Sequence, residues 1–190
     1  MRSKFASRIL RPVNVGLACA AGCAALGVAG GLWAIRELHY VNRYEAVPPV
    51  DASPLLIRSD AKGDGAYQAP RSGGRLHRGV DLSAPMGSPV RAVRSGRVIE
   101  QGTHRGLGRY VVLDHGGGMV TLYAHMSDTL VRSGERVRQG QQVGAIGKTG
   151  NAGHRLIDPH VHFEVHLYGE AVDPARLGLA WGEATGDAPG

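Results

Sequence analysis

Polar and apolar side chains alternate strictly over eight residues near the C-terminal end of the chain. The order is His160, Val161, His162, Phe163, Glu164, Val165, His166 and Leu167. A period of two predicts a β-strand with one face packed on a core and the other face polar. Two imidazoles on one strand face can converge on a small site, and neutral imidazole is the commonest protein ligand for zinc. The alternative interpretation is a solvated strand face that is rich in histidine.

A second group of chemical interest is formed by His77 and Asp81, which are four residues apart with Gly79 between them. The pattern indicates a turn that leads into a strand. An imidazole and a carboxylate brought together in this way supply one nitrogen and one oxygen ligand. An imidazole from His160 or His162 would complete the three protein ligands that catalytic zinc sites commonly use. Taken singly, Asp81 is better explained as a turn cap and His77 as a surface residue before the strand.

His125 belongs to a third group, Thr121 to Met126. On a regular strand Thr121, Tyr123 and His125 share one face. This alternation predicts His125 on a polar face beside a tyrosine. A histidine with a structural role is the alternative.

The elements that must position these residues read as short strands separated by glycine turns. The chain contains 29 glycines and only 5% aromatic residues, and it has no long amphipathic pattern. Residues 109–114 and 119–125 flank three glycines and predict a hairpin. Residues 90–100 are a further apolar run, and residues 131–147 repeat an apolar residue followed by glycine. Together they predict a small antiparallel β-sheet architecture.

The N-terminal region predicts export. Residues 1–12 are basic, and residues 13–35 are an uncharged, largely apolar run. As a helix this run would be about 34 Å long, enough to cross a bilayer core of about 30 Å. The denser positive charge before the run predicts a cytoplasmic N-terminus and a periplasmic or extracellular domain. A signal segment cleaved near residues 27–29, giving a secreted protein, and a lipoprotein modified at Cys23 are the alternatives.

The remaining boundaries follow from composition. Residues 36–59 contain three prolines and lack periodicity, which predicts a linker. Residues 60–177 carry the three groups and form the expected domain, and residues 178–190 are expected to be a disordered tail. The net charge of +6 favours an acidic partner. Nucleic acid, anionic lipid and an anionic cell-wall polymer all satisfy this, and charge does not choose among them. Export narrows the choice, and for a domain attached to the membrane through its N-terminal segment we expect no nucleic-acid partner. No oligomeric state is indicated.

Taken together, the three groups resemble the M23 metallopeptidases, which are LytM-like and lysostaphin-like peptidoglycan endopeptidases. The resemblance covers about residues 60–177. The matching motifs are His77-x-Gly79-x-Asp81, Tyr123-Ala124-His125, and Pro159 to Val165 with its His160-Val161-His162 core.

The resemblance implies a small antiparallel β-sheet fold with a groove whose floor carries Zn²⁺. It implies that His77, Asp81 and His162 are the metal ligands and that His125 and His160 are catalytic. It further implies a zinc metalloendopeptidase that hydrolyses peptide bonds in peptidoglycan stem peptides or cross-bridges. Glu164 follows the metal strand, where it would either orient a ligand or face solvent.

Two further expectations accompany the resemblance. The connection Asn151 to Asp158 is longer than is usual in the family, which predicts a loop at the edge of the groove. The alternative function is a non-catalytic M23-like domain that binds or activates a cell-wall hydrolase. Such relatives usually lose metal or catalytic residues, whereas this chain has all five.

Overall fold

The computed structural model describes residue 31 and residues 42–182. The chain divides into two units, residues 1–39 and 40–190, and the described strands all belong to the second. The expected basic N-terminus (1–12) and membrane or signal segment (13–35) lie outside the described residues, apart from Gly31. Within the described part of the chain, no helix has the length and apolar character needed to cross a bilayer.

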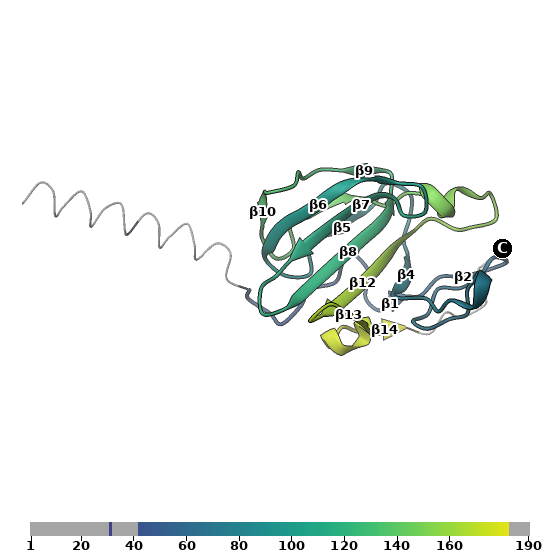
Figure 1. The fold of residues 1–190 in the computed structure, drawn as a ribbon, viewed down its shortest axis with the longest axis horizontal. Helices are drawn as coiled ribbons and strands as arrows, with labels where there is room; N and C mark the ends of the chain where they lie inside the picture. The colour runs from purple at the N-terminus through teal and green to yellow at the C-terminus, as the bar shows by residue number, and fades with distance from the viewer. Residues whose placement is uncertain (1–30, 32–41, 183–190) are drawn as a thin grey trace, which may run out of the picture. The chain divides into compact units, whose positions relative to one another are not determined.

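Antiparallel strands dominate the second unit, and residues 42–182 contain no α-helix (Figure 1). This confirms the predicted mainly β, antiparallel architecture. The main sheet contains β4 (Val80–Ser83) and, in spatial order, β10 (Arg136–Val137), β6 (Gly96–His104), β7 (Gly108–Asp114), β8 (Met119–Met126), β12 (His160–Leu167) and β13 (Glu170–Val172). Strand β12 is central, because it pairs with β8 along one edge and with β4 and β13 along the other.

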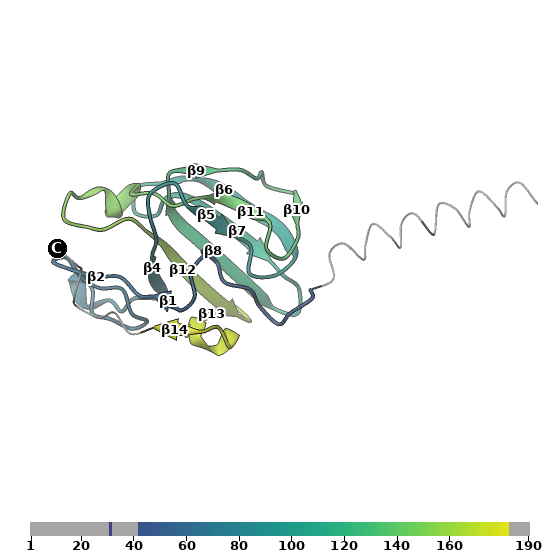
Figure 2. The same ribbon diagram turned by 180° about the vertical axis from the view of Figure 1, so that it is seen from behind.

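Smaller sheets and turns complete the domain (Figure 2). A three-stranded sheet has the order β5 (Pro89–Arg91), β11 (Gln142–Ala145) and β9 (Asp128–Thr129). Two short ladders are β1 (Leu55–Leu56) with β14 (Trp181–Gly182), which are parallel, and β2 (Ser59–Asp60) with β3 (Gly63–Asp64). Three 3₁₀ helices are η1 (Ser72–Gly74), η2 (Gly150–Gly153) and η3 (Pro174–Leu177).

The hairpin predicted over the glycine run is confirmed as β7 and β8. Gly116, Gly117 and Gly118 all have positive φ, between 59° and 80°. Glycine adopts this conformation without a steric penalty, so three in succession allow the chain to reverse tightly. The other edge of β8 pairs with β12.

The alternation on β12 separates two faces, and both are buried. On one face Val161, Phe163 and Val165 are at most 1% exposed and belong to the hydrophobic core. On the other face His160, His162 and Glu164 are 2%, 7% and 8% exposed. The interpretation of β12 as a solvated strand face is therefore wrong.

The expected linker, residues 36–59, is packed against the sheets over residues 42–59. Val50 and Leu55 are fully buried in the core, and Ile57 bridges to Leu82 of β4. An apolar run from Leu55 to Ile57 was the sequence signal for this packing, and the prolines nearby obscured it. The tail expected at 178–190 also belongs to the fold as far as β14, because Trp181 of β14 pairs with Leu55 of β1. Residues 183–190 lie outside the described part of the chain.

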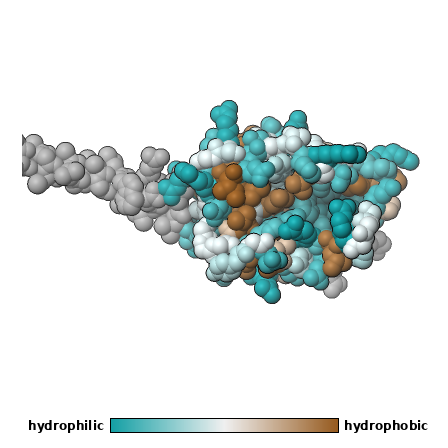
Figure 3. All heavy atoms as spheres, viewed as in Figure 1, coloured by the Kyte–Doolittle hydropathy of each residue, from teal (hydrophilic) through white to brown (hydrophobic). Residues whose placement is uncertain are grey.

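Apolar side chains that reach the surface of the described domain are dispersed. In the face shown in Figure 3, hydrophobic side chains form separate areas between hydrophilic ones. The large exposed apolar residues come from many different elements and turns and are Tyr44, Leu56, Leu76, Met86, Ile99, Leu130, Leu156 and Tyr168.

Leu55→Ala is expected to lower the free energy of unfolding by about 2–5 kcal/mol, because it removes a fully buried side chain from the core. Urea unfolding followed by circular dichroism would measure the change. Leu56→Ala is the matched control, since Leu56 is the neighbouring leucine and is 44% exposed. Equal, small effects of both substitutions would show that residues 42–59 are not part of the cooperative domain.

Candidate functional site

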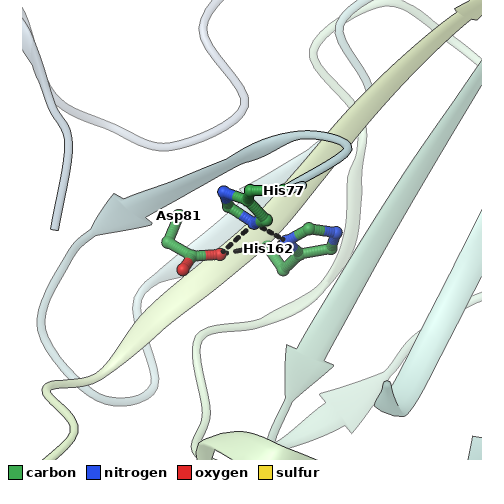
Figure 4. A group of neighbouring side chains, drawn as sticks. All are labelled: His77, Asp81 and His162. Atoms are coloured by element: carbon green, nitrogen blue, oxygen red, sulfur yellow. Dashed lines mark hydrogen bonds and ion pairs between the residues drawn. The ribbon is translucent and has the colours of Figure 1, made fainter. Parts of the chain in front are cut away.

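Strand pairing brings the histidine strand and the His77–Asp81 turn together. In the β4–β12 register Asp81 lies directly opposite His162, and Val80 lies opposite Phe163. Gly79 makes this approach sterically feasible, because a Cβ at that position would overlap the Phe163 carbonyl and the Glu164 side chain. His77 precedes β4 and turns its ring toward the same point (Figure 4).

The side chains of His77, Asp81 and His162 converge on one point and are suited to hold a metal ion. Asp81 Oδ1 lies 2.9 Å from His162 Nδ1 and 3.2 Å from His77 Nε2. The two imidazole nitrogens are 2.8 Å apart. Ligands placed tetrahedrally at zinc distances of 2.0–2.1 Å would be about 3.3 Å from one another. The donor set and its spacing therefore fit a small divalent cation after a minor expansion.

The remaining ring nitrogens determine the tautomers of the two imidazoles. His77 Nδ1 lies 2.8 Å from the Ala66 carbonyl, and His162 Nε2 lies 2.9 Å from Glu164 Oε1. Both acceptors require an N–H from the ring, so in the neutral form of each ring the lone pair is on the nitrogen that faces Asp81, which is the form that can bind a metal. Glu164 is thus a buried hydrogen-bond partner of His162, and the interpretation of it as a solvent-facing residue is wrong. Its other oxygen accepts from His166 Nε2 at 2.6 Å.

Protonation in the absence of metal follows from these contacts. Burial alone would raise the pKa of Asp81, but hydrogen bonds from His162 and His77 hold it well below its ordinary value. Burial alone would lower the pKa of His162, but its contacts with Asp81 and Glu164 outweigh burial and raise the pKa to about 9. Asp81 is therefore a carboxylate at neutral pH, and a metal must displace a proton from His162.

His125 reaches the site through a bulge that the sequence pattern did not predict. The β7–β8 register shifts between Arg109 and Val111, and His125 has a positive φ of 63°. An extra residue of this kind reverses the alternation of side chains along a strand. Tyr123 consequently packs in the core against Phe163, whereas the ring of His125 lies 5.1 Å from that of His160 and 5.8 Å from that of His162. The predicted common face of Tyr123 and His125 is wrong.

His125 and His160 are oriented by backbone carbonyls. His125 Nδ1 lies 2.9 Å from the Thr149 carbonyl, and His160 Nδ1 lies 2.7 Å from the Asp158 carbonyl. In each ring Nδ1 therefore carries the proton and Nε2 the lone pair. Burial and the nearby His162 and His160 lower the pKa of His125 to about 3, and burial lowers the pKa of His160. Both rings are neutral at neutral pH and can accept a proton.

The connection from Asn151 to Asp158 is attached at both ends to these two histidines. Thr149, just before it, accepts from His125, and Asp158, at its end, accepts from His160. The loop also contacts the β6–β7 turn, because Asn151 N donates to Gly106 O. The loop therefore lies beside the site, in agreement with the expectation.

Three charged residues at the site were missed by the sequence analysis. Arg58 pairs with both Asp60 and Asp81, and Arg71 lies 3.3 Å from Asp81 Oδ2. Arg58 follows the apolar run from Leu55 to Ile57, so recognising β1 would have brought it into consideration. Among the described residues, four histidines had no role assigned from the sequence, namely His104, His115, His154 and His166. His166 bonds Glu164 and His115 bonds Thr121, while His104 and His154 accept from nearby backbone amides.

The sequence and geometry match a known family. The model of peptidase family M23 matches residues 75–174, slightly more than half of the chain. The chain belongs to peptidase family M23. The resemblance drawn from the motifs is thereby confirmed. The DD-carboxypeptidase/endopeptidase Mpg of Neisseria meningitidis is 40% identical over 111 residues, which are 58% of this chain and 25% of that protein. The match thus spans about a quarter of the length of that relative.

Solved structures support the same assignment. A zinc-containing peptidase from Vibrio cholerae has a TM-score of 0.54 and 33% identity, over 69% of this chain and 38% of that one. A chain of the complex of SpoIIIAH and SpoIIQ has a TM-score of 0.55 and 25% identity, over 69% of this chain and 98% of that one. The first structure is described as a peptidase that contains zinc, and the second is a protein crystallised with a partner.

Glu164→Gln is expected to weaken zinc binding about tenfold or more, because partners that orient a ligand typically contribute 10–100-fold to metal affinity. The substitution removes the negative charge that His162 and His166 share. Competition with a chromophoric chelator would measure the dissociation constant. Glu170→Gln, at an exposed position of β13, is the control. Equal affinities of the two variants would contradict a ligand-orienting role for Glu164.

Proposed function

We propose that this protein is an exported zinc metalloendopeptidase that hydrolyses peptide bonds in peptidoglycan stem peptides or cross-bridges. The observation that carries the proposal is the convergence of His77, Asp81 and His162 beside two neutral histidines, His125 and His160. In the proposal the first three hold Zn²⁺ and the last two are catalytic. Membership of a peptidase family supports the reaction class.

The roles of the side chains follow from their protonation and orientation. Bound zinc would supply a Lewis acid that activates water and polarises the scissile carbonyl. His160 Nε2 lies 3.9 Å from Asp81 Oδ1, so its lone pair is close to the ligand cluster and available to take a proton from the attacking water. His125 lies across from His160, where it can stabilise developing charge or return a proton to the leaving amine. The two imidazoles share these tasks.

The substrate and location rest on the relatives and on charge. The relative Mpg is named as a DD-carboxypeptidase/endopeptidase, and three Vibrio cholerae relatives are named as peptidoglycan DD-endopeptidases. A net charge of +6 favours an anionic wall polymer. We propose that residues 1–12 and 13–35 place the domain in the periplasm or outside the cell, by membrane anchoring or as a cleaved signal. A reporter fused after Gly190 should then be active only outside the cytoplasm, and activity inside would refute the proposed location.

Digestion of purified peptidoglycan tests the reaction. The zinc-loaded protein is expected to release peptides with new amino and carboxyl termini, identified by mass spectrometry. Release of glycan fragments with intact peptides, or no release, would contradict peptide hydrolysis. His162→Ala serves as the control for contaminating hydrolases.

A second candidate function is a non-catalytic domain that binds or activates a cell-wall hydrolase. The similarity to a chain of the SpoIIIAH–SpoIIQ complex favours it, since that chain was crystallised with a partner. In the digestion assay this function predicts no release by the protein alone and faster release when a hydrolase is added. Retention of all five site residues favours the peptidase.

A further inference from the structure

Arg58 and Asp60 contact the site although they precede residues 75–174, which the family model matches. Arg58 Nη2 lies 3.0 Å from Asp81 Oδ2, and Arg58 Nη1 lies 2.6 Å from Asp60 Oδ2. The side chain of Arg58 is 6% exposed. A buried cation is costly unless it is paired, and the planar fork of arginine allows it to contact both carboxylates at once.

The two oxygens of Asp81 have different surroundings. Oδ1 faces His162 Nδ1 and His77 Nε2, whereas Oδ2 faces Arg58. Arg71 approaches the same Oδ2 from the more exposed side, at 3.3 Å. The guanidinium of Arg58 therefore restrains rotation of the carboxylate and leaves a single oxygen directed at the histidines.

Asp60 connects Arg58 to the part of the site that contains His160. Its Oδ2 pairs with Arg58 and also accepts from the backbone N–H of Asp158 at 3.0 Å. The carbonyl of Asp158 in turn accepts from His160 Nδ1 at 2.7 Å. One carboxylate thus joins Arg58 to Asp158, the residue whose carbonyl orients His160.

We propose that Arg58 and Asp60 are positioning residues, Arg58 for the proposed metal ligand Asp81 and Asp60 for His160. Arg58 fixes Asp81 with one oxygen directed at the metal, and Asp60 fixes the ring of His160 through the backbone of Asp158. The inference rests on the proposed function, in which Asp81 is a zinc ligand and His160 takes part in proton transfer. It assigns part of the site to the segment that the sequence presented as a linker.

Loss of Arg58 has two opposed effects on metal affinity. Removing a positive charge close to the site would by itself strengthen the binding of a cation. Removing the contact that orients a ligand weakens it, typically 10–100-fold. Weaker zinc binding after loss of Arg58 therefore indicates that Arg58 positions Asp81. Stronger zinc binding indicates only that its positive charge repels the cation.

Zinc dissociation constants of the full chain, measured by chelator competition, test the role of Arg58. Arg58→Met and Arg58→Lys are both expected to raise the constant about 10- to 100-fold, because neither can contact the two carboxylates as a fork. Arg91→Met is the matched control. Arg91, in β5, pairs with Asp51 and so also connects residues 42–59 to a strand. This pair lies at an exposed position. An unchanged or smaller constant for Arg58→Lys, which keeps the buried charge and so the fold, would overturn the proposal.

The role of Asp60 is tested by turnover at saturating zinc. Asp60→Ala is expected to lower kcat roughly 10- to 100-fold, since a misplaced reacting group can cost that much. Asp60→Asn retains an oxygen for the Asp158 N–H and should recover much of the loss. Equal kcat for wild type and Asp60→Ala, or no recovery in Asp60→Asn, would refute the role of Asp60. If the wild type itself neither binds zinc nor releases peptides, the proposed function fails, whatever the variants do.

Discussion

His162→Ala is expected to leave the protein without bound zinc and without turnover. Its Nδ1 lies within 3 Å of both Asp81 Oδ1 and His77 Nε2, so the imidazole occupies the centre of the proposed ligand set. With His162 absent, only one nitrogen and one oxygen remain, fewer than the three protein ligands of catalytic zinc sites. Metal analysis after dialysis should show about one zinc per chain for the wild type and almost none for the variant.

The control for this substitution is His104→Ala, which removes a histidine from the end of β6, away from the proposed ligands. It is expected to retain zinc. His77→Ala and Asp81→Ala should behave like His162→Ala. Circular dichroism must show that each variant is folded, because Asp81 and His162 are buried. Zinc retained by folded His162→Ala while His160→Ala is metal-free would reverse the assignment of the two histidines.

His160→Ala is expected to retain zinc and to lose turnover about 10²–10⁴-fold, the usual contribution of a proton-transfer residue. The ring is held by the Asp158 carbonyl with its basic nitrogen near the ligand cluster, and burial lowers its pKa so that it is neutral. Release of peptides from peptidoglycan, with zinc content determined on the same sample, would measure both properties.

His125→Ala provides the comparison within the site, because the two rings meet edge-on and both are held by backbone carbonyls. It too should keep zinc and lose turnover. A control outside the site is His154→Ala, on an exposed part of the adjacent loop. Turnover of His160→Ala within twofold of wild type would exclude His160 from proton transfer.

Much of the fold and part of the site followed from local patterns in the sequence. The period of two over residues 160–167 predicted β12 and the common face of His160 and His162, because side-chain direction along a regular strand depends only on sequence spacing. The glycine run predicted the β7–β8 hairpin for a similar local reason. Residue type suggested His77 and Asp81 with either His160 or His162 as metal ligands, and the family resemblance implied His162. The convergence of these side chains required the β4–β12 register.

The tertiary structure alone decided which face His125 occupies and which residues support the metal ligands. His125 leaves the face of Tyr123 because a positive φ and a register shift interrupt the strand, and neither has a signature in the residues from 121 to 126. Arg58 reaches Asp81 across 23 positions of the chain. Such contacts depend on how separate segments pack, which spacing along one segment cannot encode. The sequence determined the chemical groups and the strands that carry them, and packing determined which groups meet.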